Sequence, residues 1–371
     1  MFFNVLSFMD ITTSFNQKNF LIQKANFTLD SHKNLISLIM ERHGEKSIFK
    51  IKMIDDNDEY DSFLVESDSG LFCVKMSFDN LAIFYEFMIL KGIEILNLSP
   101  IAIDRNELKL NQTIYYTIQS FETSENLKTF GFSSILESEY IDFYKKIAKL
   151  HTFEVPKEVI DYLDNTESFL IYQNENFFKN ILPYVDKYEE YTYNQIKNIF
   201  KECYDEMMEM FNQNKNSLNL NRLVHGNLDG STIIENSFQF KFINFENAFI
   251  GSPFFDIANL VLELQMTGLK EFDFVSNLIN EIRLCDNRFL AGHLLNEYRI
   301  CKKIWIRKKF LDLIKEFVKE VIVYNKTRQE KILSLSNEFS KHYYRFDEIL
   351  TFVKNKELII GLYTENFLNN N

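Results

Sequence analysis

The chain has 371 residues and is 46% hydrophobic, which is enough for a large core without disulfides and for two domains or one bilobal unit. Its formal net charge of −12 argues against a general nucleic-acid binder, because such proteins neutralise phosphates with an excess of Lys and Arg. The four cysteines form no CxxC pair and no apolar run reaches about 18 residues, so we expect reduced thiols, no transmembrane helix and a cytoplasmic protein.

The first third of the chain predicts a helix, then strands, then a second helix. Residues 29–42 carry apolar side chains at helical spacing, with Ser31 as a candidate N-cap. Residues 68–70, Asp-Ser-Gly, lie between two alternating runs and are typical of a hairpin turn. Residues 78–92 have a helical pattern. The predicted strands are 47–53, 62–67, 71–77 and 114–118.

The rest of the chain predicts mainly helices. Residues 140–151 are strongly helical, and the sequence after about 262 has the same character. The segment 299–331 combines many Lys and Arg residues with apolar residues at helical spacing. It is either a docking helix for an acidic partner, a membrane surface or nucleic acid, or a long amphipathic helix whose exposed face is positive. We expect the second.

Three short segments between residues 223 and 258 carry the most specific pattern. They read Leu-Val-His-Gly-Asn-Leu-Asp-Gly-Ser-Thr over 223–232, Phe-Ile-Asn-Phe-Glu over 242–246 and Gly-Ser-Pro-Phe-Phe-Asp-Ile-Ala over 251–258. This set resembles the catalytic core of the aminoglycoside phosphotransferase and choline kinase family, whose fold is that of protein kinases. The resemblance covers roughly 46–265. The GxSxG, HExxH, Walker A and GxGxxG patterns do not occur.

The resemblance also marks three changed positions. In the family the first segment reads His-Gly-Asp with an Asn five residues later, and the second reads Ile-Asp-Phe-Glu. Asn227 therefore stands at the general-base position, and Thr232 and Asn244 stand at the metal-ligand positions. An amide cannot accept a proton at neutral pH, which removes a rate factor of about 10²–10⁴. Asp229 and Glu246 are the nearby carboxylates that could act as surrogate base and surrogate ligand.

Other residues of the motif have fold-holding roles in the resembled family. The invariant frame includes the His before the catalytic loop and an aspartate that braces this loop from a later helix. The resemblance implies that these roles are kept, so we expect a folded kinase-like body in which no catalytic or metal-binding residue is intact. The structural positions are His225, Gly226, Gly251, Pro253 and Asp256.

The strand region would then supply a nucleotide grip. The resemblance places Lys75 at the position of the phosphate-gripping lysine and Glu86, eleven residues later, at that of its ion-pair partner. Gln119 and Phe121 would lie at the hinge between lobes. Alternatively, Lys75 is an ordinary strand lysine and Glu86 a solvated helix glutamate.

The turn before Lys75 differs from the small-residue turn that the family uses to hold phosphates. Residues 55–61 read Asp-Asp-Asn-Asp-Glu-Tyr-Asp, and no glycine occurs between Gly44 and Gly70. Each pair of like charges at about 5 Å costs roughly 0.8 kcal/mol even in water. The turn therefore either repels a triphosphate, points into solvent or forms a cation site, and all three interpretations lack a phosphate cradle.

The resemblance implies an α+β fold, the bilobal protein-kinase-like fold, with a small antiparallel-sheet N-lobe that carries one main helix and a large, mostly helical C-lobe. The expected boundaries are an N-terminal extension over 1–45, the N-lobe over 46–122 and the C-lobe over 123–371, with a C-terminal helical extension from about 265.

Three functions remain open. The first is a pseudokinase, a binding, scaffold or structural protein with no expected cofactor, whose partner is another protein or a second copy. The second is an active small-molecule kinase that transfers the ATP γ-phosphate to an amino sugar, a choline-like alcohol or a related metabolite with Mg²⁺. The third is a nucleotide-binding sensor without transfer. Abundant Phe, Asn, Ile and Lys indicate an AT-rich bacterial or viral genome, so association with a virion is also conceivable.

Overall fold

The computed structural model describes residues 29–45, 47–56, 60–110, 112–121, 140–176, 190–230, 232–236, 239–264, 266, 268–286 and 291–331. The chain forms two compact units built from interleaved segments. The first contains Met1–Leu163 and His225–Ala248, and the second contains Asp164–Val224 and Phe249–Asn371. Each unit is described by itself below, and the lobe boundaries expected from the sequence stay a prediction.

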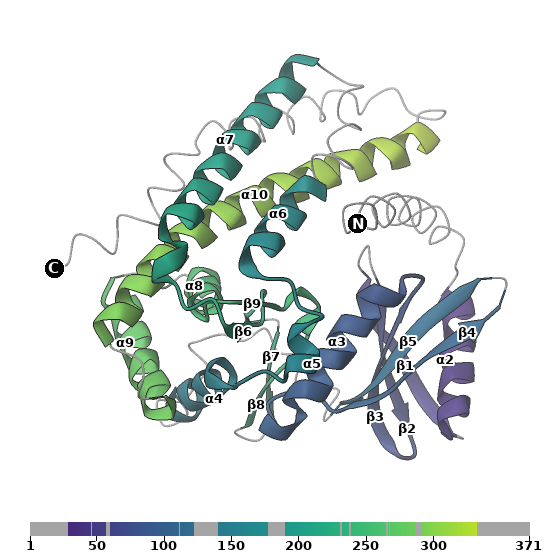
Figure 1. Cartoon of the computed structure of the whole chain (residues 1–371). Coiled ribbons are helices and arrows are strands. Elements are labelled where there is room, and N and C mark those ends of the chain that lie inside the picture. The colour runs from purple at the N-terminus through teal and green to yellow at the C-terminus, as the bar shows by residue number, and fades with distance from the viewer. Residues whose placement is uncertain are drawn as a thin grey trace, which may run out of the picture. The chain divides into compact units, whose positions relative to one another are not determined.

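The first unit contains a five-stranded antiparallel sheet with the strand order β1-β2-β3-β5-β4 (Figure 1). The tight turn predicted at residues 68–70 joins β2 to β3, where Ser67 pairs with Gly70. The strands are β1 (Ile48–Asp56), β2 (Asp61–Ser67), β3 (Gly70–Ser77), β4 (Ala102–Lys109) and β5 (Thr113–Phe121).

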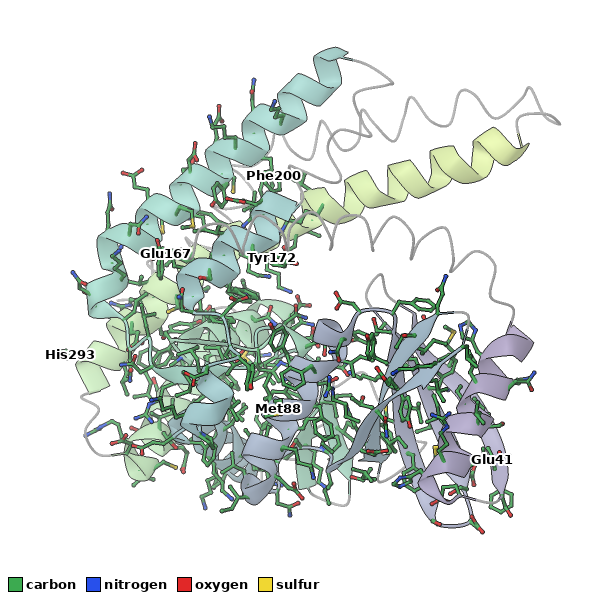
Figure 2. The ribbon with its side chains drawn as sticks, turned by 45° about the vertical axis from the view of Figure 1, so that its right-hand side comes forward. Glu41, Met88, Glu167, Tyr172, Phe200 and His293 are labelled. Carbon is green, nitrogen blue, oxygen red and sulfur yellow. The ribbon has the colours of Figure 1, made fainter. Side chains whose placement is uncertain are left out.

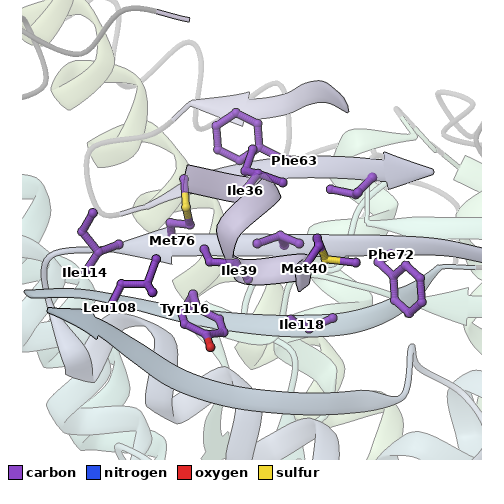
Figure 3. Packing of buried hydrophobic residues seen from close by; sticks show 12 residues of the cluster. Ile36, Ile39, Met40, Phe63, Phe72, Met76, Leu108, Ile114, Tyr116 and Ile118 are labelled. Carbon is purple, nitrogen blue, oxygen red and sulfur yellow. The ribbon is translucent and has the colours of Figure 1, made fainter. Parts of the chain in front are cut away.

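Helix α2 (Leu29–His43) covers one face of this sheet. Its buried side chains Ile36, Ile39 and Met40 pack on alternate residues of the strands, those whose side chains point to this face of the sheet (Figure 3). Burial of each aliphatic side chain contributes about 1.5–3 kcal/mol, which fixes the helix on the sheet. Ser31 lies inside the helix and not at its N-cap, so this detail of the prediction is wrong. The strand residues of the cluster are Phe63, Val65, Phe72, Val74, Met76, Leu108, Ile114, Tyr116 and Ile118.

The opposite face of the sheet, here called the inner face, is more polar. Because side chains alternate along a strand, the residues between those of the α2 cluster point to this face. In register across the sheet, Ser62 lies opposite Lys75, Lys75 opposite Thr117 and Thr117 opposite Arg105. Helix α3 (Asn80–Ile93) follows β3 and supplies Glu86 to Lys75 of this row.

The first unit continues with short elements that connect to the sheet. The hairpin of β7 and β8 is tied to the segment after α3 by a hydrogen bond from the Phe242 amide to the Leu98 carbonyl oxygen (2.7 Å). Phe143 of the predicted helix 140–151 packs edge-on against Phe240. These elements are η1 (Glu94–Leu96), α4 (Tyr140–Thr152), α5 (Lys157–Ile160), β7 (Ile233–Asn236), β8 (Gln239–Phe242) and η6 (Phe245–Asn247).

The second unit is mainly helical around a short antiparallel strand pair. Trp305 is its largest buried side chain and stacks parallel to Phe169. Phe200 of α7 is fully buried, whereas Tyr172 of α6 is exposed (Figure 2). Its elements are α6 (Thr166–Asn176), α7 (Glu190–Asn214), η5 (Lys215–Ser217), β6 (Arg222–Val224), β9 (Phe249–Gly251), α8 (Phe254–Glu263), α9 (Gly268–Cys285) and α10 (Ala291–Lys331).

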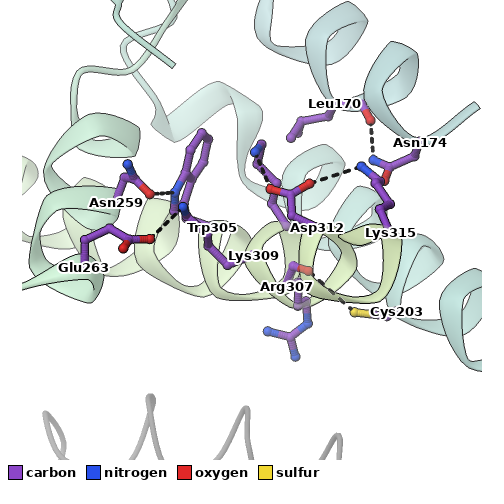
Figure 4. A network of polar contacts seen from close by, with 11 residues as sticks. Leu170, Asn174, Cys203, Asn259, Glu263, Trp305, Arg307, Lys309, Asp312 and Lys315 are labelled. Atoms are coloured by element: carbon purple, nitrogen blue, oxygen red, sulfur yellow. Dashed lines mark hydrogen bonds and ion pairs between the residues drawn. The ribbon is translucent and has the colours of Figure 1, made fainter. Parts of the chain in front are cut away.

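Helix α10 contains the basic segment, and five of its described cations pair with acidic residues of the same unit. Lys309 pairs with Glu263 (2.8 Å), and Lys315 pairs with Asp312 (3.1 Å), as Figure 4 shows. Up to residue 315, the helix therefore behaves as an internal helix of its unit. The further pairs are Lys302–Glu271, Arg307–Glu206 and Lys308–Asp312.

In the part of the chain that the structure describes, no helix has both the length and the apolar character that a membrane crossing requires.

Candidate functional site around Lys75

Lys75 and Glu86 form the ion pair that the resemblance implied. The Lys75 Nζ atom lies 2.8 Å from Glu86 Oε2 and 2.9 Å from Glu86 Oε1. Both side chains are almost completely buried. Neither residue is therefore the solvated strand lysine or helix glutamate of the alternative interpretation. A buried charge pair of this kind persists only where the geometry is good, because desolvation of both ions opposes it.

The segment after β8 brings two further acceptors to Lys75. Asn244 Oδ1 accepts a hydrogen bond from Lys75 Nζ at 3.2 Å, and Glu246 Oε2 lies 3.7 Å from the same nitrogen. Asn244 has a left-handed backbone with φ of 64°, a conformation that Asn tolerates better than most residues. This conformation begins the short helix η6, which carries Glu246.

The charges of this group do not cancel. Burial lowers the pKa of Lys75, but the carboxylates of Glu86 and Glu246 raise it by more than burial lowers it. The pKa therefore lies well above the usual value, and the ammonium group stays charged. Burial raises the pKa of Glu86, and Lys75 opposes this effect. With both carboxylates ionised, one lysine faces two negative charges, and the neutral amide of Asn244 adds none.

Tyr60, which sequence reasoning did not identify, completes the group. Lys75 Nζ lies 4.6 Å from the centre of the Tyr60 ring, within the range of a cation–π contact. The Tyr60 hydroxyl hydrogen-bonds Glu246, and burial, despite the opposing effect of Lys75, raises its pKa above the usual range. Strand parity was the available signal, because Tyr60 precedes Ser62 by two residues and Ser62 lies opposite Lys75.

His225 connects the two segments of the motif. Its Nε2 lies 2.8 Å from the Ile243 carbonyl oxygen, and its Nδ1 accepts a hydrogen bond from the Asn227 amide at 3.4 Å. These partners require a neutral ring with the proton on Nε2. Burial lowers the pKa of His225 to about 4, which agrees with this tautomer at neutral pH.

Gly226 is required by both its conformation and its surroundings. Its φ is 82°, and an added Cβ would overlap the carbonyl oxygen of Asn247 at the end of η6. Only glycine combines a positive φ with such a close approach of two backbone segments.

In the loop between residues 227 and 232, the side chains of Asp229 and Thr232 form hydrogen bonds with the backbone of the same loop. The Thr232 hydroxyl donates to the carbonyl oxygens of Asn227 and Asp229 (both 3.1 Å) and accepts from the Asp229 amide (3.0 Å). Asp229 Oδ1 in turn accepts a hydrogen bond from the Thr232 amide at 3.2 Å. Thr232 therefore holds the turn in shape, and Asp229 caps it.

These donors do not fit a magnesium ion, the metal that the resemblance implies for ATP-dependent transfer. Mg²⁺ is usually held by one or two carboxylates. The Thr232 hydroxyl is hydrogen-bonded within its own loop, and Asn244 Oδ1 is neutral and accepts a hydrogen bond from Lys75. Among the described residues, no group of three or more His, Cys, Asp or Glu side chains is arranged to hold a metal ion.

The predicted hinge residues lie at the end of β5, on the inner face. Gln119 is buried, and its Nε2 donor has no hydrogen-bond partner. Phe121 packs in a small apolar cluster with Leu64 and Cys73.

The remaining motif residues lie in the second unit. An added Cβ at Gly251 would collide with Thr166 and Phe249. Pro253 is the N-cap of α8, and Asp256 is fully buried in its first turn.

The acidic turn is described only in part. Residues 57–59 lie outside the described part of the chain. Residues 55 and 56 end β1. Asp61 belongs to β2, and its Oδ2 lies 3.4 Å from His32 Nε2 of α2, so this carboxylate is on the outer face and does not face Lys75.

No protein-family model matches the chain, and neither does any curated protein sequence. Solved structures do match. An ethanolamine kinase of Plasmodium vivax is 12% identical with a TM-score of 0.50, and the match covers 85% of this chain and 84% of that one. An APH(2")-type aminoglycoside phosphotransferase solved with GDP and kanamycin is 12% identical with a TM-score of 0.50, and the match covers 88% of this chain and 98% of that one. Another, solved with streptomycin and ATP, is 14% identical with a TM-score of 0.50, and the match covers 88% of this chain and 97% of that one. The predicted α+β fold is thereby confirmed: the chain has the protein-kinase-like fold of ethanolamine kinase and the aminoglycoside phosphotransferases.

Proposed function

We propose that this protein is a pseudokinase, a kinase-like fold that acts by binding and does not transfer phosphate. The proposal is supported first by residue type. Asn227 is neutral where a base would act, and Thr232 and Asn244 are neutral where a metal would be held. Phosphoryl transfer depends almost wholly on positioning and on charge neutralisation, so loss of all three groups removes its main contributions.

The observation that carries the proposal is that the replaced side chains have other partners. Thr232 is bonded to the backbone of its own loop, and Asn244 accepts a hydrogen bond from Lys75. Asp229, the candidate surrogate base, caps the same loop through the Thr232 amide. Each group serves the folded state, and recruitment of a metal would require these bonds to break.

The molecule would then act through its surface. We propose another protein or a second copy of the chain as the partner. The interaction would take place in the cytoplasm of a bacterium or of a virus-infected cell, or in a virion. The binding surface of a pseudokinase needs no nucleotide, so this activity should persist in nucleotide-free buffer.

The primary test is ATP turnover by the purified full chain, followed with γ-labelled ATP and Mg²⁺ or Mn²⁺, with thermal shift measured in parallel. The proposal expects no label released or transferred above a buffer blank. A metal-dependent shift together with turnover would contradict it.

Back-substitution gives a sharper result. The triple variant Asn227→Asp, Thr232→Asn, Asn244→Asp restores the family pattern and should hydrolyse ATP slowly with Mg²⁺. The matched control carries only Thr232→Asn and Asn244→Asp, which restores the ligands without the base and should be about 10²–10⁴ slower. Equal rates for the two variants would show that residue 227 is not the missing base.

An active small-molecule kinase remains the second candidate, favoured by one observation: the Lys75–Glu86 pair is assembled. It requires the natural chain to turn over ATP and Asp229→Ala to abolish this. A nucleotide sensor would show a metal-independent thermal shift without turnover.

A further inference from the structure

We propose that Tyr60 and Glu246 cover Lys75, so that the chain itself excludes anionic ligands from this lysine until Tyr60 moves away. This contact of Tyr60, Lys75 and Glu246 is called the Tyr60 latch. The inference goes beyond the proposed function, because it concerns access of anions to Lys75, whereas the proposed function rests on a surface that binds a partner.

The first argument is the coordination of the lysine. An ammonium group has three N–H donors. Glu86 and Asn244 accept hydrogen bonds from Lys75, and Glu246 Oε2 lies in contact at 3.7 Å. The Tyr60 ring covers the ammonium at 4.6 Å, and Lys75 is 3% exposed. A phosphate oxygen could reach Lys75 only by replacing one of these partners.

The second argument concerns which partner gives way. Glu86 and Asn244 hold Lys75 by hydrogen bonds of 2.9 and 3.2 Å, whereas Glu246 is the most distant of the three acceptors and is more exposed than Glu86. Glu246 Oε2 is buried without a hydrogen-bond donor, so this carboxylate is incompletely satisfied in the closed state. The weakest links of the closed state are therefore those to Glu246 and to the Tyr60 ring.

The third argument is the set of buried polar groups beside Lys75. Ser62 and Thr117 lie opposite Lys75 in register, and each has a buried hydroxyl without a hydrogen-bond partner. The Gln119 Nε2 donor, two residues beyond Thr117, is unpartnered as well. All three residues are less than 5% exposed. A core formed for stability avoids such groups, and their gathering around one lysine indicates a place that can hydrogen-bond a ligand.

The closed latch also sets which ligands are refused. Lys75 faces the carboxyl groups of both Glu86 and Glu246, two acids for one ammonium group. An inorganic pyrophosphate or a nucleotide polyphosphate would add further negative charge next to Glu246 without a metal to offset it. Removal of the ring or of the Glu246 charge should therefore admit anions.

The test is isothermal titration calorimetry of the full chain with metal-free pyrophosphate and with ATP in EDTA, on the natural protein and on Tyr60→Ala. The variant should bind either anion about 10- to 100-fold more tightly than the natural protein, as expected when a cation–π contact and a hydrogen bond to a charged group need not be broken. Tyr172→Ala, at an exposed tyrosine of α6, is the matched control and should bind as the natural protein does.

Two milder variants keep the test valid if Tyr60→Ala fails to fold, as judged by circular dichroism. Tyr60→Phe keeps the ring and loses the hydroxyl, and Glu246→Gln keeps the shape and loses the charge. Both should tighten anion binding, Glu246→Gln more strongly. Unchanged affinity in all folded variants, including undetectable binding throughout, overturns the latch.

Turnover of ATP with Mg²⁺ is measured on the same samples. The ratio of anion affinities between variant and natural protein decides the latch, whereas turnover by the natural protein decides against the pseudokinase. A natural protein that turns over ATP while Tyr60→Ala tightens binding would keep the latch and refute the proposed function. A silent protein with equal affinities would do the reverse.

Discussion

Gly226 shows how one residue without a side chain shapes the candidate site. Its φ of 82° costs an L-residue about 1–2 kcal/mol, and an added Cβ overlaps the Asn247 carbonyl oxygen, which cannot move without shifting η6. We expect Gly226→Ala to lower the free energy of unfolding by about 2–4 kcal/mol. Urea denaturation measures this change.

Gly292→Ala is the matched control for this prediction. Gly292 lies in the first turn of α10, its φ is not positive, and no atom lies within 4 Å of the added Cβ. Alanine is the better helix former, so this change should be neutral or stabilise by up to about 1 kcal/mol. An equal loss at both glycines would show that the clash at Gly226 is relieved by relaxation.

His225 predicts a pH dependence of stability. Its folded pKa of about 4 lies below the unfolded value of 6.5, so the unfolded chain takes up the proton first as the pH falls. The stability that the neutral His225 ring contributes is fully present above pH 6.5. It falls by at most about 3 kcal/mol as the pH is lowered from 6.5 to 4. Denaturant unfolding of the natural protein and of His225→Gln over this range measures the difference. The prediction fails if the two proteins lose stability with the same pH slope.

The helix pair α9 and α10 is held together by a buried charge whose partners come from both elements. Glu271 of α9 accepts hydrogen bonds from Lys302 Nζ (2.6 and 2.7 Å) and from the Tyr298 hydroxyl (2.7 Å), both on α10. Removal of one partner leaves a buried ion without its counter-charge, which costs about 3–5 kcal/mol. We therefore expect Glu271→Ala to destabilise the protein by this amount, measured by urea unfolding.

The control is an exposed pair of the same chemistry. Lys91 and Glu94 lie 3.2 Å apart with about 40% of each side chain exposed, so Glu94→Ala should cost no more than about 0.5 kcal/mol. The double variant Glu271→Met, Lys302→Met should recover much of the loss, because two apolar residues need no counter-charge. If the double variant is as unstable as Glu271→Ala, packing and not charge accounts for the effect.

Elements with a clear period were predictable from the sequence, and those with a disturbed period were not. The helix over 29–42 and the hairpin around residues 68–70 follow from spacing and turn chemistry. Strand β4 was missed because a bulge between Ala102 and Asp104 breaks its alternation and because its inner face carries the polar Arg105.

The site was predictable only where its residues are near in sequence or match a family pattern. Lys75 and Glu86 are eleven residues apart, and strand-to-helix spacing brings them together. Asn244 lies 169 residues from Lys75, and only the resemblance marked its position. Tyr60 was missed although the predicted hairpin pairs β2 with β3, because Tyr60 precedes β2 and the turn at residues 68–70 does not fix where its ring lies.

At the scale of the whole chain, the fold assembles the candidate site within one unit from distant segments. In the sequence, the segment His225–Ala248 lies between β6 and β9, which pair with each other in the second unit, and it belongs to the first unit, which contains Lys75. The site thus depends on contacts between segments of high sequence separation, such as that of Lys75 with Asn244.

The charge distribution of the whole chain gives the last prediction. The net charge of the chain is −12. Two cations of α10 pair with acidic residues of the same unit, Arg307 with Glu206 and Lys309 with Glu263. A polyanion therefore meets a net negative field, in which these two cations are already paired. We expect that the natural protein is not retained on heparin above about 50 mM salt. At this salt concentration the Debye length is still longer than the distance across an ion pair, so attraction by an exposed basic surface would still be detected. Glu206→Gln with Glu263→Gln uncovers Arg307 and Lys309 and should elute later than the natural protein. Strong retention of the natural protein, weakened by salt, would instead identify the basic segment as a docking helix for an anionic partner.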